Sequence, residues 1–373
     1  MIKWSASRLD AANYCLMLLW LKYYDPLKPK QENLAAFAKG GLLHNLIENF
    51  WQGLGDNEKQ VKSQSKAFKK IKYYDSESFA KHAQGKWMQR VKASEFSDNP
   101  ISWRFEKQEF VIKSQLKGIC QEMFPILYKE GTPEFSELPI DFIFGNKRFT
   151  GRIDEVRIRN GKVIIRDFKS GKPWLGHMKI NHDPQLTIYN AGLCELARKD
   201  PEIAEKLGLE DRVKYYGGNP LFVDPEINME FFMVEAPYLI KKFENNPKKY
   251  SSVTSPQTIL PTHRTNEHFF EVLNMIDGTM QRIREGIVYA ERGRKCDSCS
   301  MKQPCEKKLS EQGIGNLEDY AGNICLSLVS PMYAKNQEKE IQEIKKRKRK
   351  GKSHPDQMSF RLQYKNSPHV CGN

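Results

Sequence analysis

The sequence of 373 residues contains no hydrophobic run long enough to cross a membrane. The apolar stretch from Cys15 to Trp20, near the start of the chain, is far shorter than the roughly 20 residues that a transmembrane helix needs. The start also lacks the small-residue cleavage site of a secretory signal. These absences exclude the membrane and secreted classes, and we expect a cytoplasmic protein with no membrane partner.

Acidic residues are too few to balance the basic ones. Lys and Arg number 60 against 46 Asp and Glu, which leaves a net charge of +14. Half of this surplus, +7, lies in residues 335–373, where eleven basic residues face four acidic ones, and the other +7 lies on the body of the chain. A basic body favours a polyanionic partner, either nucleic acid or an anionic membrane surface.

The basic tail contains two short motifs. KKRKRKGK (345–352) is expected to add sequence-independent, salt-sensitive affinity for phosphates, and in a eukaryotic host the same letters could serve as a nuclear localisation signal. QMSFRL (357–362) resembles the short peptides by which bacterial replication proteins dock on the sliding clamp. A plain, poorly ordered tail is the alternative interpretation of both segments.

A disulfide framework is not expected, because a cytoplasmic chain keeps its eight cysteines as thiols. Four stand alone and are interpreted as buried or incidental thiols: Cys120, Cys194, Cys325 and Cys371. The segment CDSCSMKQPC differs, because it places three thiolates on one compact loop. A tetrahedral metal site needs a fourth ligand. By position, the candidates for it are Cys15, Cys325 and Cys371.

The hydrophobic pattern changes from helical to strand-like along the chain. Helices are predicted over most of the first sixty residues, with a cap at Ser5 or Ser7 and a start or a break near Gly40–Gly41. The Lys-rich residues 61–130 are also predicted to be helical, and from Phe135 the period becomes two. The elements expected next are the strands PIDFIF, RFTGRIDEVRIR and KVIIRDFKS, a helix from Asp183-Pro184, the strands RVKYYGGNPLFV and EINMEFFMV, and a helix over 266–292.

Residues 151–172, GRIDEVRIRNGKVIIRDFKSGK, contain an Asn-Gly pair that predicts a type I′ hairpin turn. With Asn160-Gly161 as the turn, the numbers of cross-strand partners sum to about 321. Asp154 therefore lies opposite Asp167, with Cβ atoms roughly 4.5–5.5 Å apart. Lys169 is two residues beyond Asp167 and shares its face of the strand. The hairpin thus gathers two carboxylates and an ammonium group around one point.

Two carboxylates this close repel one another unless a cation neutralises them, and Mg²⁺ or Mn²⁺ does so with oxygen ligands. Such an ion polarises a phosphoryl oxygen and lowers the pKa of a bound water, which a neighbouring lysine orients or deprotonates. The pattern therefore predicts metal-assisted hydrolysis of a phosphodiester. The alternative, from the hairpin alone, is an ordinary surface salt bridge on one strand face.

The hairpin resembles the signature of the PD-(D/E)xK nuclease superfamily, in which an acidic residue is followed on the next strand by D/E-x-K. The matching pieces are Gly151-x-x-Asp154 and Asp167-Phe168-Lys169. Ile153 stands where the signature has proline. The resemblance implies a restriction-endonuclease-like core and a DNA substrate.

Two further motifs are similar to those of the RecB/AddB branch of that superfamily, which includes the CRISPR-adaptation nucleases. One is the G-x-x-x-H pattern from Gly40 to His44, with Glu48 one turn later. The other is the Q-x-x-x-Y pattern of Gln185 and Tyr189, which share a helix face because they are four residues apart.

The resemblance implies a role for each matched residue. The implied ligands of Mg²⁺ or Mn²⁺ are His44, Asp154, Asp167 and the backbone carbonyl of Phe168. Lys169 would be the catalytic base or the group that orients the water. Gln185 and Tyr189 would complete the catalytic set by positioning the lysine and the DNA backbone.

The clustered cysteines extend the resemblance. Two sub-families of the RecB type bind a [4Fe–4S] cluster through one cysteine before the nuclease core and three after it, spaced C-x2-C-x5-C. Cys296, Cys299 and Cys305 have this spacing, and SASRLDAANYC is similar to the family's opening, with Leu16 where proline is usual. The resemblance implies Cys15 as the fourth ligand, in a clasp joining the chain's start to the end of the core. Zn²⁺ is the open alternative, since four thiolates suit either metal.

The predicted fold class is α/β, a mixed central β-sheet flanked by helices, with a helical insertion and an iron–sulfur clasp. The expected segments are N-terminal helices over 1–60, the insertion over 61–130, a nuclease core over 131–293, the cysteine segment over 294–330, and a basic, poorly ordered tail over 331–373.

The resemblance implies a divalent-metal-dependent DNA exonuclease acting on single strands or DNA ends, in repair, recombination, phage DNA processing or CRISPR adaptation. No G-x-x-x-x-G-K-[ST] loop is present, so we expect no attached helicase. The alternative is a catalytically inactive or zinc-containing DNA-binding or interaction module of the same fold.

Overall fold

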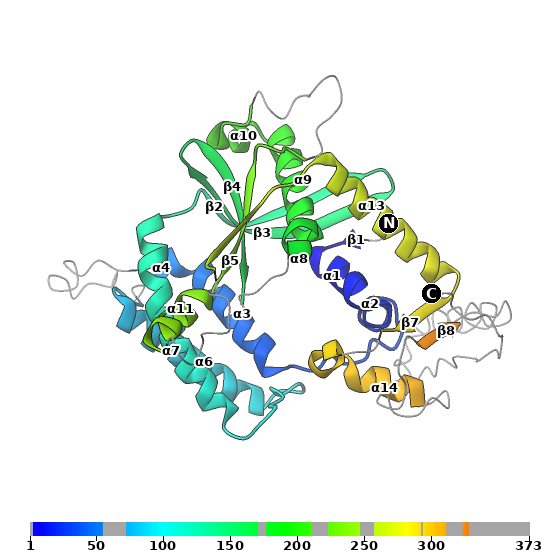
Figure 1. Cartoon of the computed structure of the whole chain (residues 1–373), viewed down its shortest axis with the longest axis horizontal. Helices are drawn as coiled ribbons and strands as arrows, with labels where there is room; N and C mark the ends of the chain where they lie inside the picture. Colours follow the sequence, from blue (N-terminus) through cyan, green and yellow to red (C-terminus); the bar gives the residue numbers. More distant parts are fainter. Residues whose placement is uncertain are drawn as a thin grey trace, which may run out of the picture. The chain divides into compact units, whose positions relative to one another are not determined.

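The computed structural model describes residues 3–54, 72–170, 177–210, 223–246, 257–291, 294–310 and 324–327. The chain divides into two compact units, whose elements are labelled in Figure 1. The first unit comprises Met1–Ser5 and Asn33–Phe270, and the second comprises Ala6–Glu32 and Glu271–Asn373. Each unit therefore combines segments that are distant in the sequence, and the segment boundaries expected above stay a prediction.

The first unit contains a mixed β-sheet. Within the described ranges its strands are β1 (Lys3–Trp4), β2 (Phe135–Phe144), β3 (Lys147–Arg159), β4 (Lys162–Lys169), β5 (Asn228–Met233) and β6 (Ile259–Thr262). Their order is β1-β3-β4-β5-β6, and β2 pairs with β3. The pairs β1–β3 and β4–β5 are parallel, and the other pairs are antiparallel.

The predicted hairpin between β3 and β4 is confirmed. Asn160 and Gly161 have φ values of 53° and 70°, the positive values that a type I′ turn requires. Glu155 pairs with Arg166 and Arg159 pairs with Lys162, which is the register expected from the sequence. Asp154 and Asp167 follow directly after the Glu155–Arg166 pair, so the hairpin places them opposite one another.

Helices cover both faces of this sheet. α9 (Pro184–Lys199) packs on β2, β3 and β4. On the other face, Phe168 and Phe232 join a buried cluster with α3 (Ala35–Glu48), α6 (Ser76–Glu95) and α7 (Gln108–Glu130). The predicted α/β class with a mixed central sheet flanked by helices is confirmed. The shorter helices of this unit are α4 (Phe50–Gly53), α8 (His177–His182), α10 (Pro201–Leu207) and α11 (Ala236–Asn245).

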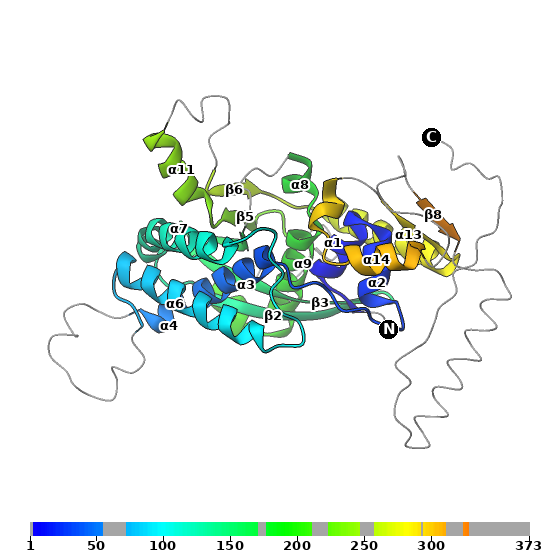
Figure 2. The same ribbon diagram turned by 90° about the horizontal axis from the view of Figure 1, so that it is seen from below.

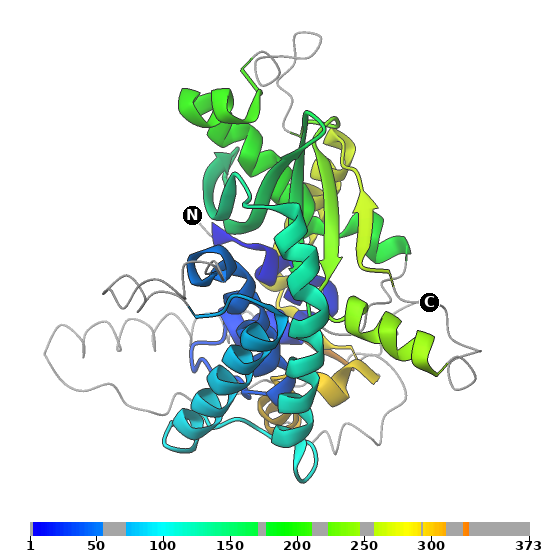
Figure 3. The same cartoon turned by 90° about the vertical axis from the view of Figure 1, so that its left-hand side faces the viewer.

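The described part of the predicted helical insertion, residues 72–130, is largely helical. α6 begins at a capping box in which Asp75 accepts a hydrogen bond from the Ser78 backbone and Ser78 caps in return. Figure 3 shows α6 and α7 side by side. Phe79 and Trp87 of α6 are fully buried in the same cluster as α3. The two helices therefore form part of the core.

Two predicted helix boundaries are wrong. α3 runs through Gly40–Gly41 without a break, because Gly40 serves close packing: a Cβ there would lie 2.5 Å from the Ser170 hydroxyl. The helix predicted over 266–292 is α13 (Asn266–Arg284), and β7 (Ile287–Ala290) follows it. Gly286, with φ 73°, makes the left-handed turn that ends the helix. β5 confirms one predicted strand, β6 was not predicted, and the strand expected at 212–223 lies almost entirely outside the described residues.

The second unit is built around a smaller core. α1 (Ala6–Tyr14), α2 (Leu16–Tyr23), β7 and α14 (Lys302–Ser310) contribute residues to it. Figure 2 shows α1, α2 and α14 close together. β8 (Ile324–Ser327) pairs with β7, and a 3-10 turn, η2, spans Arg294–Ser298. The buried Asp25 carboxylate lies 2.9 Å from the Lys308 ammonium and links the end of α2 to α14. Among the described residues, none of the helices has the length and hydrophobicity of a transmembrane segment.

Candidate active site

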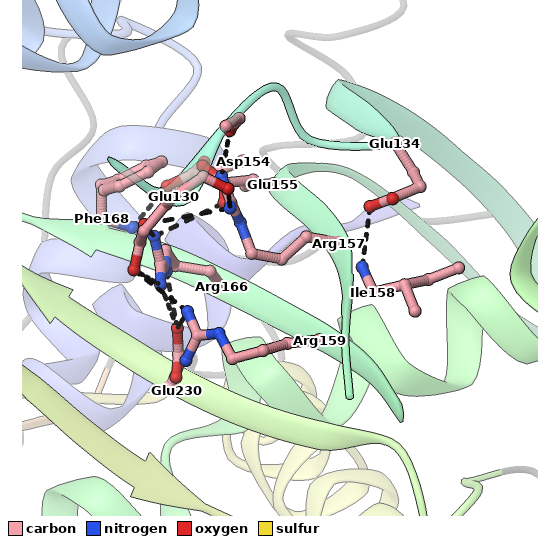
Figure 4. A network of polar contacts seen from close by, with 11 residues as sticks. Glu130, Glu134, Asp154, Glu155, Arg157, Ile158, Arg159, Arg166, Phe168 and Glu230 are labelled. Carbon is pink, nitrogen blue, oxygen red and sulfur yellow. Dashed lines mark hydrogen bonds and ion pairs between the residues drawn. The ribbon is translucent and has the colours of Figure 1, made fainter. Parts of the chain in front are cut away.

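The two hairpin aspartates lie where β3 and β4 separate. Asp154 Oδ2 accepts a hydrogen bond of 2.8 Å from the backbone N–H of Phe168, a contact drawn in Figure 4. Asp167 is 1% exposed, and its Oδ2 atom is buried without a hydrogen bond of good geometry. The Lys169 ammonium lies 2.8 Å from that oxygen. The predicted grouping of two carboxylates and a lysine is therefore present.

Gln185 connects the lysine to the rest of the site. Its Oε1 accepts a hydrogen bond of 2.6 Å from Lys169 Nζ, and its Nε2 donates to Asp167 Oδ1 and, at 2.8 Å, to the Tyr189 hydroxyl. The N-cap Asp183 holds the start of α9 by accepting a 2.8 Å hydrogen bond from the Gln185 backbone. One amide side chain thus contacts three of the residues that the sequence motifs selected.

His44 reaches the same point from α3. Its Nδ1 lies 3.5 Å from Asp154 Oδ2, and its ring meets the edge of Phe168 at 6.4 Å between centroids. The close packing of Gly40 on Ser170, the residue after Lys169, brings α3 near the end of β4. Burial lowers the pKa of His44, which favours the neutral imidazole that binds metals.

Glu137 is a third carboxylate that the sequence motifs did not identify. β2 and β3 pair Ser136 with Glu155 and Leu138 with Ile153, so Glu137 lies opposite Asp154. Asp167, Asp154 and Glu137 therefore form a row across three neighbouring strands. Glu137 also has φ 52°, a strained value for a non-glycine residue in a strand. The turn FGNK could have identified it, because a Gly145-Asn146 hairpin fixes this register.

The carboxylates of this row have perturbed acidities. Burial raises the pKa of Asp154 well above its ordinary value, and the neighbouring Asp167 and Glu137 add to the shift. Burial also raises the pKa of Asp167, opposed by Lys169, and raises that of Glu137. Tyr189 is perturbed in the same sense, since burial and the nearby aspartates raise its pKa. Lys169 at Asp167 and the exposed Arg152, whose Nη1 lies 3.7 Å from Glu137, oppose this negative charge. The three pKa values stay raised nonetheless, which is the electrostatic setting of a cation site.

The donor set suits Mg²⁺ or Mn²⁺. Carboxylate and carbonyl oxygens with one imidazole are suitable ligands for these ions, which keep several waters. The buried Asp167 Oδ2 is an oxygen that such an ion would satisfy. As the side chains stand, no group of three or more His, Cys, Asp or Glu residues in the described part of the chain, the cysteines included, is arranged to hold a metal ion. The metal-ligand roles of His44, Asp154, Asp167 and Phe168 therefore stay a prediction.

A family model of the PD-(D/E)XK nuclease superfamily matches residues 3–306 of this chain. The chain belongs to that superfamily. Its members are metal-dependent nucleases that typically use Mg²⁺ or Mn²⁺, so membership indicates hydrolysis of phosphodiester bonds in DNA. A search of curated proteins found no match.

The cysteines of this nuclease meet in its second unit. One pocket is lined by all four of the predicted ligands, Cys15, Cys296, Cys299 and Cys305. Its walls are otherwise largely apolar, with Met17, Leu18, Leu21, Ala290 and Met301 among them. Cys15 reaches the pocket because it interrupts the helical run between α1 and α2 with an extended backbone. Of the candidates for a fourth position, the structure thus brings Cys15 to the other three.

The pocket cysteines affect one another's acidity. Burial raises the pKa of Cys305 to about 12, and Cys15, Cys299 and Cys296 add to the shift. Burial raises the pKa of Cys299 as well, again with contributions from Cys15 and Cys296. The Glu291 backbone N–H lies 3.4 Å from Cys15 Sγ. Thiols in this setting stay protonated unless a cation displaces their protons.

The sequence also predicted four isolated thiols and two motifs in the basic tail. Cys120 and Cys194 are buried as expected, and burial raises the pKa of Cys120 to about 12. Cys325 belongs to β8. The basic run at 345–352, the clamp-like motif at 357–362 and Cys371 lie outside the described residues.

Proposed function

We propose that this superfamily member is a DNA exonuclease of the RecB/AddB type, acting on single strands or DNA ends. The observation that carries the proposal is the contact set of Lys169, which meets Asp167 at 2.8 Å and the motif residue Gln185 at 2.6 Å. His44, which matches the histidine of the branch's G-x-x-x-H motif, lies 3.5 Å from Asp154. The proximity of these motif residues supports the assignment to the RecB/AddB type.

The chain's own residues suit hydrolysis at this site. Mg²⁺ or Mn²⁺ held by His44, Asp154, Asp167 and the Phe168 carbonyl would supply an activated water and polarise the scissile phosphate. Lys169 orients that water or removes its proton, and its positive charge offsets the charge that develops on the phosphate. Gln185 holds the lysine in place, and Tyr189 presents its hydroxyl beside the Gln185 amide.

The charge of the chain supports a DNA substrate. The body of the protein carries a surplus of +7 apart from the tail, which suits a polyanion that must approach an acidic catalytic row. We expect DNA binding to weaken steeply as salt increases, because phosphate contacts release counterions. The clamp contact of residues 357–362 remains a sequence-based prediction.

We also propose a [4Fe–4S] cluster in the pocket of Cys15, Cys296, Cys299 and Cys305. The meeting of four cysteines from two ends of the chain supports it, as does the apolar wall that would limit solvent access. Such a cluster would close a long loop, which stabilises the folded unit by constraining the unfolded chain. Zinc is the alternative occupant.

Anaerobic purification tests the cluster. The expected sample is brown, holds about four iron atoms per chain and loses its iron in Cys305→Ala. Cys194→Ala is the matched control, since Cys194 is also buried but lies in α9, and it should keep the metal. A colourless protein with one zinc per chain would replace the iron–sulfur assignment with the zinc one.

The nuclease proposal is tested with end-labelled single- and double-stranded DNA in Mg²⁺ or Mn²⁺. We expect wild-type cleavage from an end, no cleavage by Lys169→Ala, and wild-type cleavage by Lys162→Ala, an exposed lysine on the same strand. Equal cleavage by wild type and Lys169→Ala would show that the hairpin is not the active site. DNA binding without cleavage in any metal would favour the alternative, a DNA-binding module of the same fold.

A further inference from the structure

A fully buried arginine lies at the corner where α8 leads into α9. Arg264 follows β6 and has 0% of its surface exposed. Burial of a guanidinium is costly unless its donors are satisfied. Among the arginines of the described residues, Arg264 shares this complete burial with Arg166.

Each N–H donor of Arg264 has an acceptor. Nε donates to Thr187 Oγ1 at 3.0 Å, Nη1 donates to Thr262 Oγ1 at 2.5 Å and to the His263 carbonyl at 2.8 Å, and Nη2 donates to the carbonyls of Ile180 at 2.7 Å and Asp183 at 3.3 Å. An arginine side chain has five such N–H donors, so all of the hydrogen-bond donors of the guanidinium are satisfied.

The acceptors belong to three elements that meet at this corner. Ile180 lies in the last turn of α8, where helix carbonyls lack intrahelical partners. Asp183 and Thr187 belong to the cap and first turns of α9, and Thr262 ends β6. Thr262 also donates to the Ile180 carbonyl at 3.1 Å. The guanidinium thus fixes the start of α9 relative to the sheet and to α8.

The start of α9 carries the residue that holds the lysine. Asp183, whose carbonyl Arg264 contacts, caps the Gln185 backbone at 2.8 Å. The Gln185 side chain in turn contacts both Lys169 and Asp167. A short chain of hydrogen bonds therefore runs from the buried arginine to the catalytic ammonium.

We propose that Arg264 is a positioning residue that acts through Gln185 to hold Lys169 and Asp167 in register. It contacts no reacting atom, and the inference rests on the proposed nuclease function. A lysine cannot replace it, because an ammonium has three donors and no planar fork. An apolar side chain would fill the space but would leave the α8 carbonyl and the Thr187 hydroxyl without this donor.

A double-mutant cycle tests the proposal. Arg264→Lys, Gln185→Ala and the double variant are compared with wild type by steady-state cleavage, which gives kcat and KM. Single-turnover cleavage with excess enzyme checks the rate of the chemical step in slow variants. We expect Arg264→Lys to lower kcat by about 10–100-fold, the scale of an ångström-sized misplacement, with KM within about threefold. In the Gln185→Ala background, Arg264→Lys should lower kcat by less than about twofold, because the two residues act as one unit.

A stability control separates positioning from folding. Leu116→Ala, in the fully buried core of α7, should lower the melting temperature at least as much as Arg264→Lys and leave kcat unchanged well below that temperature. Fold-losses of Arg264→Lys and Gln185→Ala that simply multiply would overturn the proposal, as would an Arg264→Lys enzyme with wild-type kcat. Absence of cleavage by the wild type would instead refute the nuclease function itself.

Discussion

The two sides of the β3–β4 hairpin carry buried charge in opposite ways. On one side, Glu155 opposes Arg166 and joins a network with Arg157, Arg159, Glu130 and Glu230, which Figure 4 shows. On the other side, one residue further along each strand, Asp154 opposes Asp167. The first side pairs three carboxylates with three guanidiniums. The second sets a row of three carboxylates against Lys169 and the exposed Arg152, which lies 3.7 Å from Glu137.

The acidities follow this difference. Burial alone would raise the pKa of Glu130, but its hydrogen bonds and ion pairs with Arg166, and the charges of Arg157 and Arg159, lower it. The pKa values of Asp154, Asp167 and Glu137 are all raised. Burial is common to both sides, so the balance of partners decides the direction. The incompletely compensated side of an otherwise neutralised hairpin is the side on which we propose the active site.

The largest expected effect comes from the acidic side. Asp154→Asn should reduce cleavage by about a thousandfold, because it removes a proposed metal ligand while keeping the shape of the side chain. DNA binding should persist, and the melting temperature should rise by roughly 2–4 °C, since a buried repulsion is relieved. End-labelled cleavage, gel-shift and thermal unfolding measure the three quantities.

The matched control for that change is Asp141→Asn on β2, whose carboxylate is exposed and paired with Arg148. It should leave cleavage unchanged. If Asp141→Asn raised the melting temperature as much as Asp154→Asn does, relief of buried repulsion could not be the reason for the stabilisation.

The balanced side should respond in the opposite direction. Arg166→Met leaves Glu230 and Glu130 without their main partner in a buried setting, and we expect a loss of about 3–5 kcal/mol in the free energy of unfolding. Urea denaturation measures it. Lys241→Met provides the exposed comparison, because its ion pair with Glu122 at 2.6 Å lies at the surface and should be worth less than about 1 kcal/mol. Equal losses would contradict a buried network.

Stabilisation by divalent ions should distinguish the two sides of the hairpin without a cleavage assay. Mn²⁺ at about 100 times its dissociation constant should stabilise the wild type by about 2.7 kcal/mol, because it binds the folded site alone. Asp167→Asn should lose most of this gain, whereas Glu130→Gln, on the balanced side, should keep it although its starting stability is lower. Thermal unfolding with and without Mn²⁺ checks the pattern, and a gain retained by Asp167→Asn would place the ion elsewhere.

The smallest expected effect is the pH dependence of stability. Asp154 and Asp167 have raised pKa values in the folded state, so the folded protein holds protons that the unfolded chain releases near pH 3.8. Stability therefore falls as pH rises from about 3.8 through their folded pKa values, by about 1.4 kcal/mol for each pKa unit of difference. Glu130 has the opposite effect on stability. Its stabilising contribution is fully present above about pH 4.5 and is lost as pH falls through its lowered folded pKa.

Unfolding curves of three proteins across pH 3 to 8 separate the two contributions, with the metal chelated. Asp154→Asn should flatten the decline on the neutral side, and Glu130→Gln should flatten the loss on the acid side. An unchanged profile in both variants would show that neither side controls the pH dependence.

Much of the candidate active site could be predicted because its parts are local. The Asn160-Gly161 turn sets the register of Asp154 and Asp167, strand alternation places Lys169, and Asp183-Pro184 starts the helix that presents Gln185 and Tyr189 on one face. Glu137 was accessible in the same way through the second hairpin turn. The break expected at Gly40–Gly41 failed because glycine permits either a turn or close packing, and only the neighbouring chain decides between them.

Local signals in the sequence specify the β3–β4 hairpin and the order of the motifs, because turns and periodicities span only a few residues. They do not specify the whole sheet, whose parallel pairs β1–β3 and β4–β5 join strands that lie far apart in the chain. Tertiary packing brings His44 to Asp154, Cys15 to the three later cysteines and Arg264 to the start of α9. These contacts join residues far apart in the chain. They depend on how whole helices pack, and no local pattern specifies that packing.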